Sequence, residues 1–94
     1  MNEIVNVDIN GKNGSFNILS KGKKIAEMTF TFAGAQKIMI DHTEVDPALQ
    51  GKGLAKKMME KAIAVAREKN WKIVPACSFA KNFLDTNPQY EDVL

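Results

Sequence analysis

Gln50-Gly51-Lys52-Gly53-Leu54-Ala55 is the stretch that decides the fold of this chain, because two kinds of sequence pattern meet there. Before it, Ile38, Ile40 and His42 alternate with other residues along what we expect to be one face of a strand. After it, apolar residues recur at helical spacing over residues 54–70. The stretch therefore predicts a glycine-containing connection from a strand to a long amphipathic helix.

The start of such a helix can bind a phosphate group. Its first backbone N–H groups have no partner within the helix, and the helix dipole places partial positive charge there. Gly51 and Gly53 leave these amides open to a ligand, and Lys52 and Lys56 add full positive charges. The alternative is that the glycines only permit a tight turn, and spacing alone favours that interpretation.

Two common nucleotide-binding motifs do not fit the stretch. A P-loop needs four residues between its first glycine and a Gly-Lys pair, and then Ser or Thr, whereas Leu54 follows Gly53 here. The dinucleotide fingerprint needs a third glycine at the position that Lys56 occupies. Neither a P-loop nor a dinucleotide-binding turn is therefore expected.

The residues instead fit a coenzyme motif. Gln50-x-x-Gly53-x-Ala55, after Val45-Asp46-Pro47, resembles the Gln/Arg-x-x-Gly-x-Gly/Ala acetyl-coenzyme A motif of the GNAT acetyltransferase superfamily. With His42-Thr43-Glu44-Val45 before it, and Pro75-Ala76-Cys77 and Asn87-Pro88-Gln89-Tyr90 after it, the chain is similar to the minimal single-domain members over roughly residues 26–90. The resemblance implies that acetyl-CoA binds as a co-substrate to Val45, Gln50, Gly51, Lys52, Gly53, Leu54, Ala55, Lys56, Cys77, Asn82 and Phe83.

The first half of the chain reads as a series of strands. Alternating apolar residues are separated by the turns Asn10-Gly11, Lys21-Gly22 and Ala33-Gly34, and such short turns imply antiparallel pairing. A further strand at residues 71–76 follows the long helix, and we expect it to run parallel to the strand before that helix.

The remaining residues predict a second helix. Ser78 is a suitable cap for a helix over residues 79–85, and residues 89–94 are expected to form a loose tail. The predicted fold is one α/β (α+β) domain over residues 1–94, with a GNAT-like mixed sheet: an antiparallel meander followed by strand, helix, strand and helix.

Length and composition suit a small cytoplasmic protein. The 94 residues are 45% hydrophobic with a net charge of +2, and they include no apolar run long enough for a membrane span. Residues 1–10 do not resemble a signal peptide. One cysteine and one histidine exclude an internal disulfide and a cysteine- or histidine-rich metal site. We therefore expect no metal and no membrane contact. We also expect a monomer or weak dimer, although nothing in the sequence decides the oligomeric state.

Three side chains are candidates for catalysis. Cys77 follows the strand after the long helix and precedes a predicted helix start, which favours an anion. Under the resemblance, Cys77 either attacks the acetyl thioester or lines the pocket, although a lone cysteine is more often a buried apolar residue. His42 and Glu44 share a strand face, and either could accept a proton from an attacking amine; their plain interpretations are a structural histidine and a solvated glutamate.

The resemblance also offers Tyr90 as a general acid for the departing thiolate. The usual tyrosine of the superfamily lies within the helix, whereas Tyr90 follows Asn87-Pro88. This departure makes Tyr90 a weaker candidate than the three residues above.

Three functions follow from these observations. The first, implied by the resemblance, is an N-acetyltransferase that moves an acetyl group from acetyl-CoA to an amine acceptor, a small molecule or a protein. The second is a module that binds coenzyme A with little or no catalysis, because elements that shape the acceptor site in larger members are missing. The third is nucleic-acid binding, because residues 51–72 hold seven basic and two acidic residues, a net charge of +5. The core spacing of the strand aromatics disfavours this third function.

Overall fold

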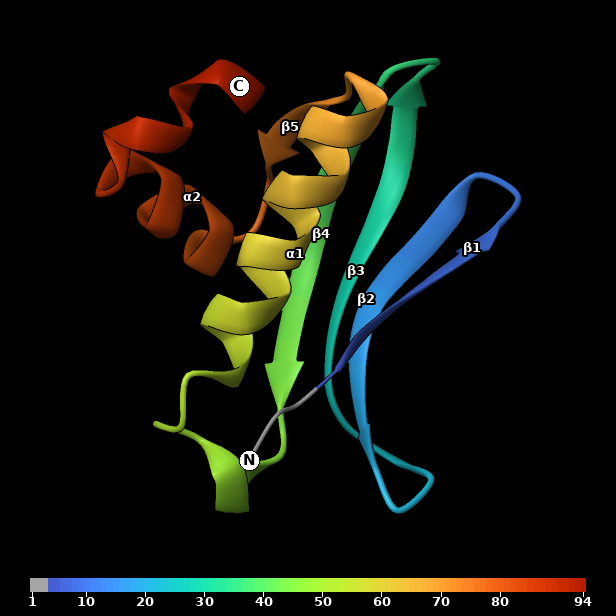
Figure 1. Cartoon of the computed structure of the whole chain (residues 1–94), viewed down its shortest axis with the longest axis vertical. Helices are drawn as coiled ribbons and strands as arrows, with labels where there is room; N and C mark the ends of the chain where they lie inside the picture. The colour runs from blue at the N-terminus through green and yellow to red at the C-terminus, as the bar shows by residue number, and fades with distance from the viewer. Residues whose placement is uncertain (1–3) are drawn as a thin grey trace.

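The structure is a computed structural model that describes residues 4–94. Its five strands form one sheet, shown in Figure 1, in the order β1-β2-β3-β4-β5. Pairing is antiparallel from β1 to β4 and parallel between β4 and β5, which confirms the predicted mixed sheet. The strands are β1 (Val5–Asn10), β2 (Asn13–Ser20), β3 (Lys23–Gly34), β4 (Lys37–Val45) and β5 (Lys72–Pro75). The helices are α1 (Leu54–Lys69) and α2 (Ser78–Asp85), with the short 3₁₀ helices η1 (Pro47–Leu49) and η2 (Pro88–Val93).

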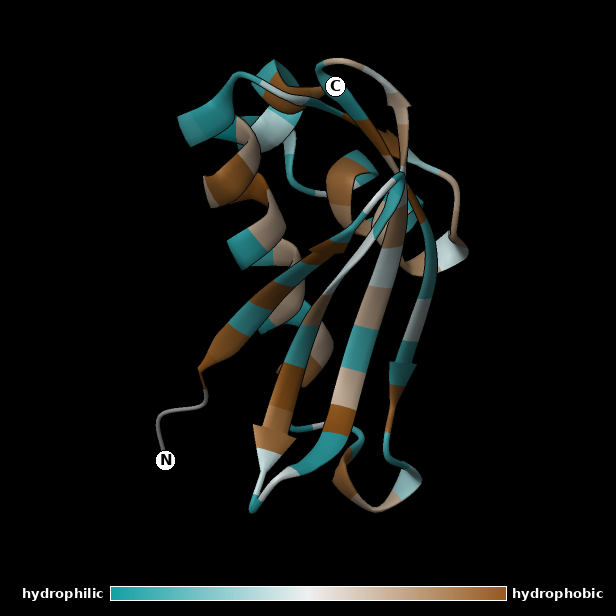
Figure 2. Cartoon of the chain, turned by 90° about the vertical axis from the view of Figure 1, so that its right-hand side faces the viewer, coloured by the Kyte–Doolittle hydropathy of each residue, from teal (hydrophilic) through white to brown (hydrophobic). Residues whose placement is uncertain are grey.

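The core lies between one face of the sheet and α1. Apolar and polar residues alternate along the strands (Figure 2), so the apolar set of each strand faces one side. The amphipathic α1 packs on that side, and α2 lies beside α1 and β5 (Figure 1). The largest side chains of this core are Phe16, Ile18, Met28, Phe30, Ile38, Ile40, Met58, Met59, Ile63 and Ile73.

A β-bulge interrupts the alternation of β4. Phe30 lies opposite Ile40, but the preceding residue of β3, Thr29, lies opposite His42. Asp41 is therefore an extra residue in β4, and the strand is displaced by one position from there on. His42 leaves the face of Ile40, so this part of the predicted alternation is wrong.

The same bulge assigns the last residues of β4 to the two faces of the sheet. Thr43 and Val45 lie opposite the buried Met28 and Ala26 and share their face, which is the side of α1. Glu44, like His42, is on the opposite face. The prediction that His42 and Glu44 share a face is correct, although the face is the one away from α1.

The cap of α2 differs from the prediction. Cys77, not Ser78, is the N-cap residue, and its sulfur accepts a hydrogen bond from the Ala80 N–H at 3.4 Å. The helix therefore begins at Ser78, one residue earlier than expected.

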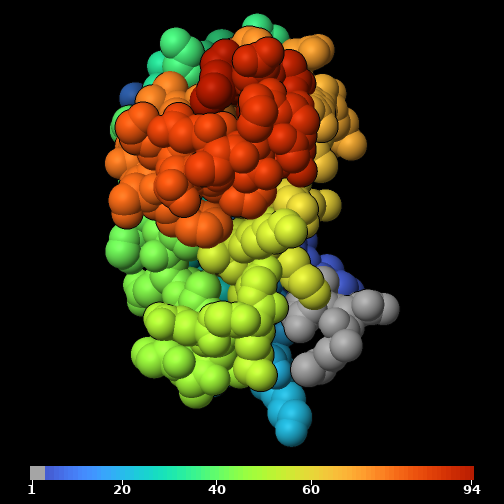
Figure 3. Space-filling model, turned by 90° about the vertical axis from the view of Figure 1, so that its left-hand side faces the viewer, coloured from blue at the N-terminus to red at the C-terminus, as the bar shows by residue number. Residues whose placement is uncertain are grey.

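The expected loose tail is also wrong. Residues 88–93 form η2, and Val93 is only 2% exposed. Arg67 of α1 donates two hydrogen bonds to the Asp92 carboxylate, at 2.8 and 3.0 Å, and Lys72 donates to the Asp92 carbonyl at 2.6 Å. In Figure 3 this C-terminal segment, coloured orange to red, covers one side of the molecule above the connection from β4 to α1.

Candidate functional site

The connection between β4 and α1 is a tight turn. The Asp46 carboxylate accepts a hydrogen bond from the Ala48 N–H at 3.0 Å and so caps η1. Gly51 and Gly53 then adopt φ values of 83° and 78°. A residue with a Cβ pays roughly 1–2 kcal/mol in this left-handed region. The predicted glycine turn is confirmed, and it leads directly into the first residue of α1.

The start of α1 is open to an anion. Gly53 is its N-cap, and among residues 4–94 no side chain caps the helix. The Lys57 N–H donates to the Gly53 carbonyl at 3.1 Å and closes the first turn. The amides of residues 54–56 precede that bond and therefore lack an intrahelical acceptor. With the exposed Lys52 and Lys56 beside them, these amides and the helix dipole favour a negatively charged group.

The edge of β4 next to this helix start is free. The parallel register of β4 and β5 ends at Ile40 and Pro75. The amides of Ala76 and Cys77 both donate to the Ile40 carbonyl, at 2.9 and 3.0 Å, and the chain then turns into α2. Within the described part of the chain, residues 41–45 have no strand partner on the β5 side. An extended ligand can add to such an edge through main-chain hydrogen bonds.

A cavity of about 360 Å³ lies at the meeting point of the free edge and the helix start. The Gln50 side chain lies at its edge and donates a long hydrogen bond, 3.4 Å, to the Val45 carbonyl. Seven of the residues predicted to contact the coenzyme come together here, whereas Lys52, Cys77, Asn82 and Phe83 do not line the cavity. The lining is Thr43, Val45, Leu49, Gln50, Gly51, Gly53, Leu54, Ala55, Lys56 and Phe79.

Sequence reasoning missed three of these lining residues. Thr43 reaches the cavity only because the bulge at Asp41 turns it toward α1. Phe79 reaches it from the first turn of α2, and Leu49 from η1. The signal available for Phe79 was its position two residues after Cys77, since both belong to the same helix start.

Cys77 does not line the cavity, but its side chain contacts a residue that does. Its half-buried sulfur lies 3.5 Å from the Thr43 hydroxyl, and Thr43 lines the cavity. The same sulfur accepts the Ala80 N–H of α2. Cys77 therefore combines a structural task at the helix start with a place beside the free edge of β4.

His42 and Glu44 form a pair on the other face of β4. The His42 Nε2 atom lies 3.2 Å from a Glu44 carboxylate oxygen, and both side chains are exposed. A proton can pass between an imidazole and a carboxylate at this distance. The pair is thus separated from Thr43 by the strand itself.

The remaining predicted residues lie in the C-terminal part. Asn82 is exposed on α2. Phe83 is half-buried between Phe79, at a ring separation of 6.0 Å, and Tyr90, on which it stacks at 5.8 Å. The Arg67 guanidinium lies 5.3 Å from the centre of the Tyr90 ring. These contacts make Phe83 and Tyr90 packing residues between α2, η2 and α1.

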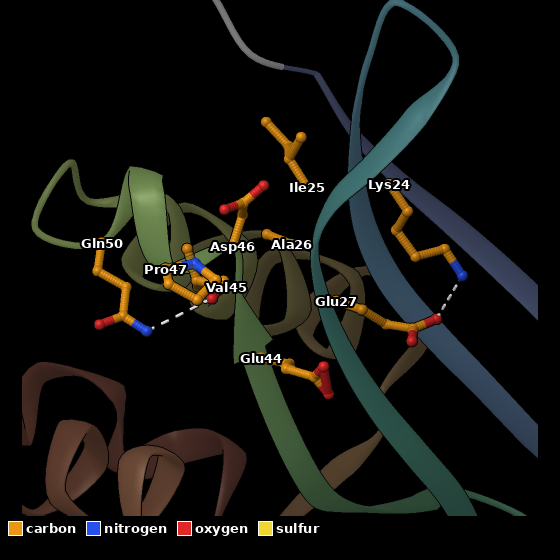
Figure 4. Close-up of a pocket in the computed structure, with 9 residues that line it drawn as sticks. All are labelled: Lys24, Ile25, Ala26, Glu27, Glu44, Val45, Asp46, Pro47 and Gln50. Atoms are coloured by element: carbon orange, nitrogen blue, oxygen red, sulfur yellow. Dashed lines mark hydrogen bonds and ion pairs between the residues drawn. The ribbon is translucent and has the colours of Figure 1, made fainter.

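A second cavity, of about 500 Å³, adjoins the first. Val45 and Gln50 line both cavities, and Figure 4 shows the residues of the second one at the end of β4 and the start of β3. Lys24 donates a hydrogen bond of 2.7 Å to Glu27, and this bond raises the pKa of the Lys24 ammonium. The lining is Lys24, Ile25, Ala26, Glu27, Glu44, Val45, Asp46, Pro47 and Gln50.

Residues 4–94 contain no cluster of three His, Cys, Asp or Glu side chains placed to hold a metal ion. Neither α1 nor α2 has the length and apolarity needed to cross a bilayer.

Fold and site together define a class of protein. A mixed sheet with a free strand edge beside an open helix start can receive a ligand that has an extended arm and a negatively charged group. The chain belongs to the GCN5-related N-acetyltransferase family, because the sequence profile of that family matches residues 15–93. This membership confirms the resemblance and places the chain among the N-acetyltransferases.

Solved structures agree with this assignment. A GCN5-like protein from Staphylococcus aureus is 34% identical with a TM-score of 0.70, over 94% of this chain and 85% of that one. A ribosomal-protein-alanine N-acetyltransferase from Brucella melitensis is 20% identical with a TM-score of 0.65, over 82% of this chain and 62% of that one. Comparison with curated protein sequences gives no match.

A third similar structure carries a ligand. It is a GNAT family acetyltransferase from Elizabethkingia anophelis with acetyl-CoA bound, 15% identical with a TM-score of 0.62, over 83% of this chain and 54% of that one. The present chain thus spans little more than half of some of these longer proteins, and at such identity the likeness concerns the fold alone.

Proposed function

We propose that this protein binds acetyl-CoA between the free edge of β4 and the start of α1 and transfers the acetyl group to an amine. The observation that carries the proposal is the free edge itself, which runs into a cavity that ends at an uncapped helix start. Family membership and the acetyl-CoA bound to the Elizabethkingia anophelis protein support the choice of ligand.

The residues present fit the two chemical parts of acetyl-CoA. The amides of residues 51–56, with Lys52 and Lys56 nearby, would hold the pyrophosphate through charge-assisted hydrogen bonds. Main-chain groups of Val45 would pair with the pantetheine arm. When bound, the coenzyme supplies an acetyl group activated as a thioester. Asn82 and Phe83, which lie outside the cavity, would contact only parts of the coenzyme that extend past α2.

His42 and Glu44 would handle the proton in a direct transfer. The amine nitrogen forms a bond to the acetyl carbon, the carbon–sulfur bond breaks, and the coenzyme leaves as a thiolate. The amine proton passes to the His42–Glu44 pair, by way of water around the end of β4, and the thiolate takes up a proton from solvent. An amine acceptor, small molecule or protein, would enter from the side of Glu44.

Cys77 offers a second route. Its sulfur would attack the acetyl carbon, expel the coenzyme thiolate and form an acetyl-cysteine, which the amine then cleaves to regenerate the thiol. The proximity of the sulfur to Thr43 supports this route. Its hydrogen bond from Ala80 supports a purely structural task instead.

The test is an amide-resolved NMR titration with acetyl-CoA, followed on the same sample by intact mass measurement. We expect shifts at Val45 and residues 50–56. If millimolar ligand leaves these signals unmoved, the proposal is wrong and the glycines serve the turn alone. Tight binding without acetylation of any of a panel of amines would identify a coenzyme-binding module.

The route through Cys77 is tested with two variants. Cys77→Ser keeps a side-chain acceptor for the Ala80 N–H, whereas Cys77→Ala removes it, so the pair separates loss of the cap from loss of the thiol. A mass gain of one acetyl group that both variants lose would establish the acetyl-enzyme. Full transfer by Cys77→Ser would leave the direct route.

Nucleic-acid binding receives less support. Phe16 and Phe30 are buried, and Phe32 and Trp71 pack edge to face at 5.2 Å against the core. Bases therefore find few exposed rings to stack on among the described residues. A steep salt dependence of binding to an oligonucleotide would reverse this conclusion.

A further inference from the structure

Thr43 is the polar side chain of the first cavity at the end where the acetyl group would lie. Of the ten lining residues, three carry polar side chains, and two of these, Gln50 and Lys56, belong to the connection before α1 and to its first turn. With the pyrophosphate held there, the arm of the coenzyme would run from Val45 back along the free edge of β4 and reach Thr43 after about 7 Å. The Thr43 hydroxyl is therefore the polar side-chain group of the cavity next to the proposed position of the thioester.

The same hydroxyl contacts the Cys77 sulfur at 3.5 Å, and either atom can be the donor. The sulfur has a second polar neighbour, the Ala80 N–H, which can only donate. In the thiol, the sulfur therefore accepts from Ala80, and its own proton can be donated to the Thr43 oxygen. In the thiolate, the hydroxyl turns and donates to the sulfur, because a hydroxyl is both a donor and an acceptor. The pair thus keeps its hydrogen bond in both protonation states of Cys77.

Within residues 4–94, no titratable side chain is bound to this sulfur. His42 and Glu44 pair with each other on the opposite face of β4. The charged groups of the other neighbouring elements have partners of their own or lie at the helix start: Lys81 is bound to Asp85 in α2, Lys72 of β5 donates to the Asp92 carbonyl, and Lys56 is in the first turn of α1. The protonation of Cys77 therefore depends on Thr43 and on the start of α2, whose dipole favours an anion.

We propose that Thr43 is a positioning residue for Cys77, whose hydroxyl stabilises the thiolate that attacks the acetyl carbon. The inference rests on the proposed function and names the residue that prepares its second route. The thiol proton leaves to solvent, the sulfur bonds to the acetyl carbon, and the bond from that carbon to the coenzyme sulfur breaks. The coenzyme thiolate takes up a proton from solvent. The amine then bonds to the same carbon and loses its proton to solvent, and Cys77 leaves as a thiolate that Thr43 again holds.

The first experiment measures the thiolate directly, without the coenzyme. Iodoacetamide alkylates the thiolate of Cys77, the single cysteine of the chain, and intact mass gives the rate at each pH. Thr43→Val keeps the β-branched shape and removes the hydroxyl, whereas Thr43→Ser keeps the hydroxyl. We expect the midpoint of the rate against pH to lie about one unit higher in Thr43→Val, so that about ten-fold less thiolate is present below both midpoints. Thr43→Ser should behave like the wild type.

The plateau of the rate at high pH separates positioning from packing. Every variant is a thiolate there, so the plateau reports access to the sulfur and its intrinsic reactivity, and Thr43→Val should reach one at least as high as the wild type. A lowered plateau with an unmoved midpoint would mean that Thr43 only shapes the cavity, which overturns the proposal. Thr86→Val is the matched control: it removes a hydroxyl from the other end of α2, where Thr86 donates to the Asn82 carbonyl at 2.8 Å. If Thr86→Val moves the midpoint as far as Thr43→Val, the effect comes from α2 as a whole and the proposal is wrong.

A second arm adds acetyl-CoA to the same variants, so that the inference and the proposed function can fail separately. Intact mass then follows the formation of acetyl-Cys77, which should be slower in Thr43→Val than in the wild type below the midpoints. Acetylation of Cys77 at equal rates in both proteins at every pH would refute the role of Thr43 and leave the proposed function standing. A shifted midpoint in a protein that does not bind acetyl-CoA would support the hold of Thr43 on the thiolate and refute the proposed function.

Discussion

The substitution Gly53→Ala separates the two interpretations of the glycine turn. Gly53 has a φ of 78°, and a Cβ built on it meets no atom within 4 Å. The cost to the folded protein is therefore backbone strain without a clash, about 1–2 kcal/mol. For a domain of this size that lowers the midpoint of thermal unfolding by roughly 4–8 °C per kcal/mol.

A matched control exists at the opposite end of the sheet. Gly11, in the turn between β1 and β2, has a φ of 65° and likewise no atom within 4 Å of a built Cβ. Gly11→Ala should therefore lose a similar amount of stability. The two variants differ in one respect: only Gly53 lies in the cavity at the start of α1.

The expected difference is in coenzyme affinity. If the amides after Gly53 hold the pyrophosphate, a methyl group and a distorted turn disturb at least one hydrogen bond to a charged group, about 1.5–3 kcal/mol. Gly53→Ala should then bind acetyl-CoA at least about ten-fold more weakly, while Gly11→Ala binds like the wild type. Urea unfolding and isothermal titration calorimetry measure the two quantities. Equal stability losses with unchanged affinity in both variants would refute the phosphate-binding interpretation.

Three further predictions concern stability. A Cβ on Gly14 would lie 2.3 Å from the buried Phe30 ring, so Gly14→Ala should cost about 1–3 kcal/mol in urea unfolding, and Phe30→Leu in the same chain should recover part of it. Met58 is fully buried, and Met58→Ala should cost about 2–5 kcal/mol; a loss below 1 kcal/mol would contradict the packing of α1 on the sheet. The hydrogen bonds from Arg67 lower the pKa of Asp92 below its ordinary value of 3.8, so their stabilisation is present above that pH and disappears as the pH falls through the lowered pKa. Asp92→Asn should accordingly unfold more easily than the wild type at pH 7 but not at about pH 2, and a difference that persists in acid would exclude this ion pair as its cause.

Local patterns were sufficient to predict the strands, α1 and the glycine turn. The helix α1 begins after Gly53 and is capped at its other end by Asn70, which has a φ of 57°. The apolar period and both capping residues lie within one short segment, so the local sequence is enough to predict this helix. Seven of the eleven residues predicted to contact the coenzyme line one cavity, because they lie at or close to this turn in the sequence.

Features that depend on distant residues could not be predicted. Asp41 at the bulge accepts hydrogen bonds from the hydroxyl groups of Thr29, at 2.6 Å, and Thr31, at 3.0 Å, on the neighbouring strand. The C-terminal 3₁₀ helix is held by Asp92 and Arg67, which are 25 positions apart.

The cap of α2 is a local feature that the sequence nevertheless predicts wrongly. A serine hydroxyl is a stronger N-cap acceptor than a thiol, so the sequence favours Ser78 over its neighbour Cys77.

The bulge at Asp41 determines how the two halves of the site can meet. It directs Thr43 and Val45 toward α1 and the cavity at its start, and it leaves His42 and Glu44 on the opposite face. A regular strand would reverse this assignment, because a shift of one residue exchanges the two faces. Groups on opposite faces of β4 cannot touch through the strand, so under the proposed function a proton would pass from the side of Thr43 to His42 and Glu44 only around the strand. Val45 and Gln50 line both cavities, so the two faces of the sheet communicate at the end of β4.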